Sequence, residues 1–218
     1  MSSSLAAVAE NLVTDTWVKA SWEEFLKLAE NPDYVNARFY YHQAYMRIET
    51  MSLGASHGQD NAILSKVVSL FATIKNIRIK ELANTSFRKA GIAECQPDLA
   101  FYIGADFQFP PRNNSPIDLN ELAPPNLVVE IASTTLSDDL GRKRLLYERL
   151  GVQEYWVVDV SVDDVIAFEI SQRRSGEIEE SRVLPGLAIA LVEEALQRSQ
   201  TQDDGEINRW LIQTFSQS

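Results

Sequence analysis

Cysteine and long apolar runs are scarce in this sequence. Of its 218 residues only Cys95 is a cysteine, so no disulfide can form within the chain, which is typical of proteins from a reducing compartment. No stretch approaches the roughly 18 apolar residues that a membrane helix needs, and the first residues lack the basic start and apolar run of a secretory signal. These absences predict a cytoplasmic protein with no membrane segment.

A positive net charge is also absent. The sequence holds 20 Lys and Arg against 31 Asp and Glu, which gives a formal net charge of −11. Proteins that bind nucleic acid non-specifically normally have a basic surface, so the total charge counts against that class. Two local clusters are basic, one between Lys75 and Lys89 and one between Arg142 and Arg149, although solvated faces of ordinary elements would explain them equally well.

The pattern of apolar residues predicts an α/β chain with one mixed sheet. Hydrophobic residues make up 45% and charged residues 23% of the chain, which are globular values. Helices are expected at 21–30, from His57 onward, and at 136–150, 189–199 and 206–215. Strands are expected at 38–41, 45–50, 77–80, 84–89, 96–103, 127–132, 155–159, 165–170 and 177–183, with a turn at Ser175-Gly176.

Two of the expected strands each carry a carboxylate among apolar residues. Glu130 interrupts the run Leu127–Ala132, where an ionised side chain would cost several kcal/mol unless a cation pairs with it. Asp98 shares its side of the preceding strand with Ala100 and Tyr102. Two acids on neighbouring central strands would converge on a divalent cation such as Mg²⁺ or Mn²⁺. In the alternative interpretation, each acid accepts hydrogen bonds from main-chain amides at a strand end.

A lysine lies on the apolar side of the helix that follows Glu130. At about 100° per residue, Lys143 falls in the middle of an apolar stripe. The stripe consists of Leu136, Leu140, Leu146, Tyr147 and Leu150. A lysine in that position must either extend toward water or meet a buried anion, and Glu130 and Asp98 are the obvious anions.

The order Pro97-Asp98, Glu130 in an apolar strand and then a lysine resembles the PD-(D/E)xK nucleases. Leu127–Ser133 (LVVEIAS) and Gly151–Asp159 (GVQEYWVVD) look more narrowly like the Uma-type restriction endonucleases, and the resemblance covers about residues 20–190. The parent pattern has its lysine two residues after the acid, where this chain has Ala132. Uma-type members resemble this chain in carrying the lysine on the following helix.

The resemblance implies a restriction-endonuclease-like core, with a central mixed β-sheet flanked by helices. Residues 1–18 would form a flexible lead-in, and residues 19–218 a single nuclease domain that includes the C-terminal helices. The implied reaction is hydrolysis of DNA phosphodiester bonds with Mg²⁺ or Mn²⁺. Asp98, Glu130 and the Ile131 carbonyl would hold the metal, while Lys143 would orient the attacking water or neutralise developing charge.

Three points stay open at this stage. His57 matches a histidine that opens the first long helix of the family, where it would contact phosphate or, as we favour, cap the helix. Cleavage of duplex DNA needs two sites, so we expect a homodimer, with aromatic residues of the 38–50 hairpin at its interface. The competing functions are a catalytically silent binding or regulatory module of the same fold, and an enzyme that acts on RNA or a small nucleotide.

Overall fold

The computed structural model describes residues 14–34, 36–50 and 54–217 of the chain. Within these residues a central six-stranded sheet is mixed, because β9 and β10 are parallel while the other neighbours are antiparallel. Its strand order is β12 (Arg174–Glu177), β11 (Asp164–Ser171), β10 (Glu154–Asp159), β9 (Leu127–Ala132), β7 (Leu99–Ile103) and β4 (Ile79–Ala83).

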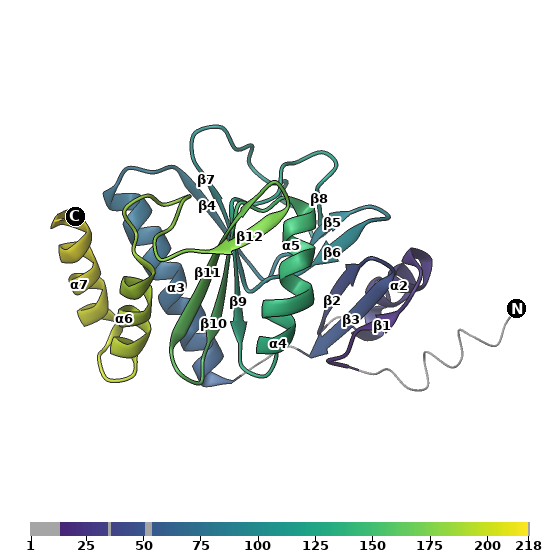
Figure 1. The fold of residues 1–218 in the computed structure, drawn as a ribbon, viewed down its shortest axis with the longest axis horizontal. Helices are drawn as coiled ribbons and strands as arrows, with labels where there is room; N and C mark the ends of the chain where they lie inside the picture. The colour runs from purple at the N-terminus through teal and green to yellow at the C-terminus, as the bar shows by residue number, and fades with distance from the viewer. Residues whose placement is uncertain (1–13, 35, 51–53, 218) are drawn as a thin grey trace, which may run out of the picture.

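A second six-stranded sheet lies beside the central sheet, at the end of the molecule that also holds α2 (Trp22–Ala29) (Figure 1). The predicted hairpin is flanked by four short strands, three on one side and one on the other. The order is β1 (Val18–Lys19), β3 (Tyr45–Thr50), β2 (Ala37–His42), β6 (Ala93–Cys95), β5 (Phe87–Lys89) and β8 (Ile117–Asp118). The sequence patterns predicted one mixed sheet, whereas the structure has two.

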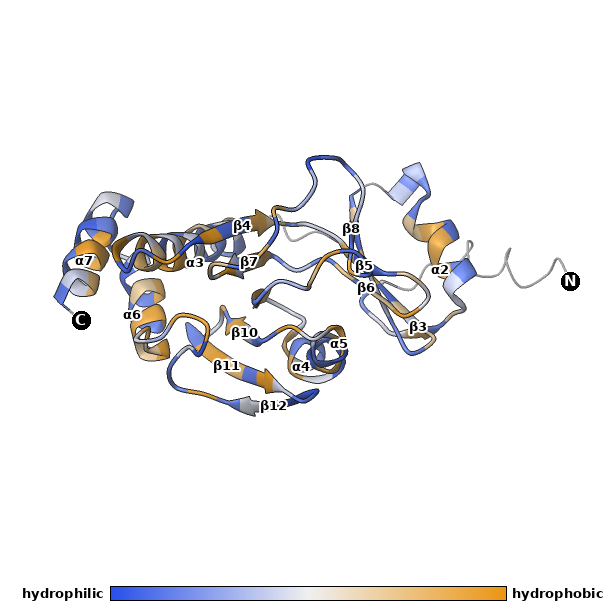
Figure 2. Ribbon diagram, turned by 90° about the horizontal axis from the view of Figure 1, so that it is seen from above, coloured by the Kyte–Doolittle hydropathy of each residue, from blue (hydrophilic) through white to orange (hydrophobic). Residues whose placement is uncertain are grey.

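Helices cover both faces of the central sheet (Figures 1 and 2). One face packs against α3 (Ala55–Ile74), α6 (Ile189–Ser199) and α7 (Asp204–Gln217). The other face packs against α5 (Arg144–Leu150) and the second sheet, and α5 follows α4 (Leu136–Asp138) and the π-helical turn η2 (Asp139–Lys143). None of the helices in the described ranges is long and apolar enough to cross a bilayer.

The alternation along the central strands decides which face each side chain meets. Leu99 and Val129 point toward α3, whereas Ala100, Val128 and Ala132 point toward α5 and the second sheet. Because side chains alternate along a strand, Glu130 shares the direction of Val128 and Ala132. The carboxylate therefore faces the layer that contains α5 and β2.

Three local predictions differ from the structure. The strand expected at 177–183 does not form, because β12 ends at Glu177 and the following residues make a loop with one isolated bridge at Glu180. The long helix begins at Ala55 with Gly54 at the N-cap position, so His57 lies in the first turn and does not cap it. The predicted turn at Ser175-Gly176 lies inside β12, and the chain reverses instead at Gln172 and Arg173, which have φ of 51° and 61°. Tight hairpin turns favour Asn and Gly at such positive φ values, and neither residue is present to mark this one.

Candidate active site

Asp98 and Glu130 come together where β7 meets β9. Leu99 pairs with Val129 in the antiparallel ladder, so continuing the register by one residue sets Asp98 opposite Glu130. The side chains are nearly removed from solvent, with 1% of Asp98 and 2% of Glu130 exposed. Two carboxylates with so little hydration require partners that supply positive charge or hydrogen bonds.

Lys143 points into the same layer from the last residue of η2. Its Nζ lies 2.8 Å from Asp139 Oδ1, 3.0 Å from the Glu49 carboxylate and 3.9 Å from Glu130 Oε2. Only 1% of the residue is exposed, so its side chain does not extend toward water. Burial would lower the pKa of Lys143, but the neighbouring carboxylates of Glu130, Asp139 and Glu49 raise it, and the ammonium stays charged.

Asp98 is held as a carboxylate by three partners. Its Oδ1 accepts a hydrogen bond from Arg38 Nη2 at 2.6 Å and lies 3.0 Å from His57 Nε2, while its Oδ2 accepts from the Ile131 main-chain N–H at 2.8 Å. Burial alone would raise the pKa of Asp98, yet the hydrogen bond with His57 and the charge of Arg38 together lower it. Asp98 thus has the main-chain partner of the alternative interpretation, and His57 contacts Asp98 instead of capping its helix.

Glu130 has the opposite electrostatic balance. Tyr147 donates to its Oε1 at 2.6 Å, and Tyr40 donates at 3.2 Å. Among the described residues, Oε2 has only Tyr40 at 3.5 Å and Lys143 at 3.9 Å. Burial raises its pKa to about 8; Lys143 opposes this shift, and the charges of Asp139, Asp98 and Glu49 add to it. With a pKa near 8, the Glu130 carboxyl group is mostly protonated near neutral pH unless a cation in addition to Lys143 binds beside it.

Glu49 and its neighbours on the hairpin are site residues that the sequence patterns did not reveal. Glu49 lies on β3 beside Lys143 and accepts from Arg47 Nε at 2.5 Å, and Arg47 Nη1 also pairs with Asp138 at 2.8 Å. Arg47 and Glu49 are two residues apart on an otherwise aromatic and apolar strand, and both are buried. This alternation of charges was the available signal, because strand residues two apart share a face.

Three of the hairpin's aromatic residues are buried within the chain, while Tyr45 is half-buried. Phe39 and Tyr41 pack against α2, while Tyr40 belongs to the cluster beneath α5. The exposed fractions of Phe39, Tyr40 and Tyr41 are at most 6%, so these three side chains do not provide the dimer surface that the sequence suggested. The hairpin instead brings Arg38, Tyr40 and Glu49 to the two carboxylates.

All five residues that the sequence nominated line one cavity of about 240 Å³. They arrive from α3, the start of β7, β9 and η2, which are far apart in the sequence. The lining consists of Asp15, Arg38, Glu49, His57, Asp98, Glu130, Ile131, Ser133, Thr134, Thr135 and Lys143. In the described ranges no group of three or more His, Cys, Asp or Glu side chains is arranged to hold a metal.

Comparison with known proteins agrees with this architecture. A solved structure titled a "putative nuclease belonging to DUF820", from Anabaena variabilis, matches 81% of this chain and 98% of its own with a TM-score of 0.54. The sequences are 20% identical, so the likeness concerns the fold, and it agrees with the predicted restriction-endonuclease-like core. No curated protein matches the chain.

The sequence profile of one family covers most of the chain. The profile is described as "Putative restriction endonuclease" and matches residues 22–211, which include every side chain lining the cavity except Asp15. With this coverage, the chain belongs to the Uma2 family of restriction-endonuclease-like proteins.

Proposed function

We propose that this protein is a metal-dependent endonuclease that hydrolyses DNA phosphodiester bonds. The supporting observation is the meeting of Asp98, Glu130 and Lys143 at one cavity, from three elements that are separate in the sequence. Two acids and a cation beside a small polar cavity are the groups that phosphodiester hydrolysis uses. Membership in the Uma2 family, described as a putative restriction endonuclease, supports a nuclease activity.

The residues at the cavity fit Mg²⁺ or Mn²⁺. Asp98, Glu130 and the Ile131 main-chain carbonyl would hold the ion through hard oxygen ligands, and water would complete the set, as is usual for Mg²⁺. Among the described residues Glu130 Oε2 has no partner closer than 3.5 Å, and burial raises its pKa although the Lys143 ammonium opposes that shift. A divalent cation here would supply Lewis-acid activation of the phosphate and of the attacking water.

The side chains of the site have separate tasks in this proposal. The charged Lys143 ammonium neutralises the negative charge that develops on the phosphoryl oxygens, and its raised pKa means that it does not act as a base. Arg38 and His57 both contact Oδ1 of Asp98 and so hold its carboxylate in one orientation. Glu49 and Asp139 hold Lys143 in place from the other side.

A catalytically silent module of the same fold is the second candidate. The Arg38 guanidinium lies 2.6 Å from Asp98 Oδ1, so a cation already neutralises this carboxylate. The net charge of −11 also disfavours tight DNA binding. A silent module would bind its partner without turnover in any divalent metal.

Plasmid nicking separates the two candidates. Supercoiled plasmid is incubated with the purified protein in Mg²⁺, in Mn²⁺ and in EDTA, and the nicked form is measured on gels. We expect nicking that requires the metal and that is lost in Asp98→Asn and in Lys143→Met, whereas Asp106→Asn, at an exposed loop position, keeps it. Equal nicking by Asp98→Asn and the wild type, or no nicking in either metal, contradicts the proposal.

We also propose that the protein acts as a homodimer, because cutting both strands of a duplex requires two active sites. Sedimentation equilibrium on the wild-type protein measures the assembly directly. A mass of two chains together with double-strand cuts supports the proposal, while a monomer that only nicks contradicts it.

A further inference from the structure

The residues that carry the proposed chemistry are closed off from solvent. The exposed fractions of Asp98, Glu130 and Lys143 are at most 2%. The cavity that they line measures about 240 Å³, below the roughly 300 Å³ at which small-molecule sites begin. A phosphodiester bond in DNA carries a sugar and a base on each side, so part of the cavity wall must move before the bond reaches these groups.

Only a few of the residues that line the cavity reach the surface. Asp15, Ser133 and Thr134 are exposed and Thr135 is half-buried, while the other lining residues are buried. The mouth of the cavity therefore lies between residues 14–17 on one side and residues 133–135 on the other. The family profile begins at residue 22, so the first of these two walls lies outside the family pattern.

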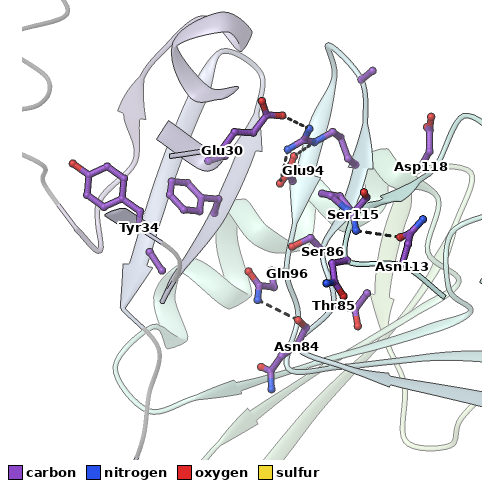
Figure 3. A pocket seen from close by; sticks show the side chains of 17 residues that line it. Glu30, Tyr34, Asn84, Thr85, Ser86, Glu94, Gln96, Asn113, Ser115 and Asp118 are labelled. Carbon is purple, nitrogen blue, oxygen red and sulfur yellow. Dashed lines mark hydrogen bonds and ion pairs between the residues drawn. The ribbon is translucent and has the colours of Figure 1, made fainter. Parts of the chain in front are cut away.

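The larger cleft shown in Figure 3 does not offer an anionic strand another entrance. It occupies about 750 Å³ and shares no lining residue with the cavity. Glu30, Glu94 and Asp118 line this cleft. Its one basic lining residue in the described chain is Arg88, which is paired with both glutamates. DNA phosphates would meet net negative charge there, so the entrance lies at the mouth beside residues 14–17.

Residues 14–17 are held against the protein by few contacts. The Asp15 N–H donates to the Ile48 carbonyl at 2.8 Å, and Trp17 Nε1 donates to Asp138 Oδ1 at 3.0 Å. The Arg142 guanidinium lies 5.3 Å from the centre of the Trp17 ring, and the other three side chains of the segment are exposed. Asp15 has φ of 60°, a left-handed conformation that is uncommon outside glycine. Its own backbone preference therefore favours release.

Asp15 also places a negative charge at the mouth of the cavity. Its carboxylate has no hydrogen-bond or ion-pair partner in the part of the chain that the structure describes. An unpaired carboxylate repels phosphate oxygens. The segment thus opposes an anionic substrate by its charge at the same place where its main chain narrows the entrance.

The point where Trp17 is fastened is connected to the proposed catalytic lysine. Asp138 also pairs with Arg47 Nη1 at 2.8 Å. Arg47 in turn pairs with Glu49, which lies 3.0 Å from Lys143 Nζ. If the segment only supported this network, loss of the Trp17 ring would loosen the site and lower its function. If the segment blocks the site, the same loss raises it.

We propose that residues 14–17 act as an autoinhibitory strap across the mouth of the active site, and that they swing away to let a DNA strand enter. This inference rests on the proposed nuclease function. The movement takes place at the junction with β1, which stays paired with β3 in both states. The hairpin that presents Glu49 to Lys143 is therefore undisturbed when the strap opens.

Fluorescence anisotropy with a short fluorescein-labelled DNA duplex in Ca²⁺, which takes the same oxygen ligands as Mg²⁺, measures access to the site. Because apparent affinity scales with the fraction of open molecules, Trp17→Ala should tighten binding roughly tenfold. Asp15→Asn should tighten binding roughly fivefold at low salt, and by less at high salt because ions screen the charge. Trp210→Ala, where Arg198 lies 4.3 Å from the indole ring on α7, and Asp106→Asn are the matched controls and should keep the wild-type affinity.

Hydrogen exchange measures the movement itself. The Asp15 amide, which is bonded to the Ile48 carbonyl, should exchange faster once saturating duplex is added. Unchanged or slower exchange would mean that the segment is a fixed wall, and it would overturn the inference.

Affinity and plasmid nicking together separate the strap from the proposed function. Wild-type or weaker affinity in either Trp17→Ala or Asp15→Asn overturns the strap, whether or not the protein nicks plasmid. Tighter binding by both variants without nicking in Mg²⁺ or Mn²⁺ supports the strap and contradicts the nuclease. Damage to the fold would only weaken binding, so a gain in affinity cannot come from a misfolded variant.

Discussion

Replacing Glu130 with glutamine should make the metal-free protein more stable while removing its activity. Glutamine has the same shape and can still accept the hydrogen bond from Tyr147, but it carries no charge at any pH. The wild-type carboxyl group is buried, which makes its ionisation unfavourable, and the charges of Asp139, Asp98 and Glu49 add to that cost. The substitution therefore removes a carboxylate whose ionisation destabilises the folded protein, and at the same time removes a proposed metal ligand.

The size of this effect follows from the raised pKa of Glu130. The folded protein has a pKa of about 8 for this group against 4.5 ordinarily, so folded chains hold a proton that unfolded chains release. The free energy of unfolding thus falls as pH rises from 4.5 to 8. At about 1.4 kcal/mol per pH unit, the wild type loses roughly 1 kcal/mol by pH 5 and about 3 kcal/mol by pH 7. The glutamine variant avoids this loss.

Urea unfolding in EDTA at pH 5, 7 and 8, followed by tryptophan fluorescence, measures the difference. Glu130→Gln should exceed the wild type by about 3 kcal/mol at pH 7 and by less at pH 5. Glu169→Gln, whose side chain is 47% exposed, should change stability by under about 0.5 kcal/mol. A variant less stable than the wild type at pH 7, or a gap that does not vary with pH, would refute the reasoning. Added Mg²⁺ should stabilise only the wild type.

Three further substitutions test the structure elsewhere. Lys143→Met leaves the buried Glu49 and Asp139 without their ammonium partner and should cost about 3–5 kcal/mol in urea unfolding; a cost below about 1 kcal/mol would show that the pairs contribute little. Gly151→Ala forces alanine into a left-handed φ of 85° and should cost about 1–2 kcal/mol with nicking unchanged, and equal melting temperatures would contradict this. Ser21→Ala removes the capping box of α2 and should cost about 1 kcal/mol in thermal unfolding, with no cost if the cap is frayed in solution.

The parts of the site that could be predicted depend on local periodicity. Leu127–Ala132 is apolar enough to identify a strand buried on both faces, and all six residues are buried. Helical spacing placed Lys143 inward, and the structure agrees. Asp98 and Glu130 could be predicted as site residues because a charged side chain in a buried strand is costly and therefore needs a functional or structural reason.

The parts that could not be predicted depend on contacts between distant segments. The second sheet includes β5, β6 and β8, which have two or three residues each, too few for a period to be seen. Their pairing is decided by packing after the chain has folded. Glu49 reaches Lys143 only because the hairpin docks beneath α5, and nothing within 45–50 specifies that docking.

The π-helical turn η2 bears on how the site tolerates a change of one residue in chain length. A π turn contains one residue more than an α turn, and such turns recur at functional sites. Deleting Gly141 would restore ordinary α spacing and turn Asp139 and Lys143 into an i,i+3 pair, which still shares one face of a helix, so the buried pair could be kept. Every acid and the lysine would still be present in such a chain. Among Uma2 relatives, a one-residue gap at this turn should therefore not by itself mark a disabled copy.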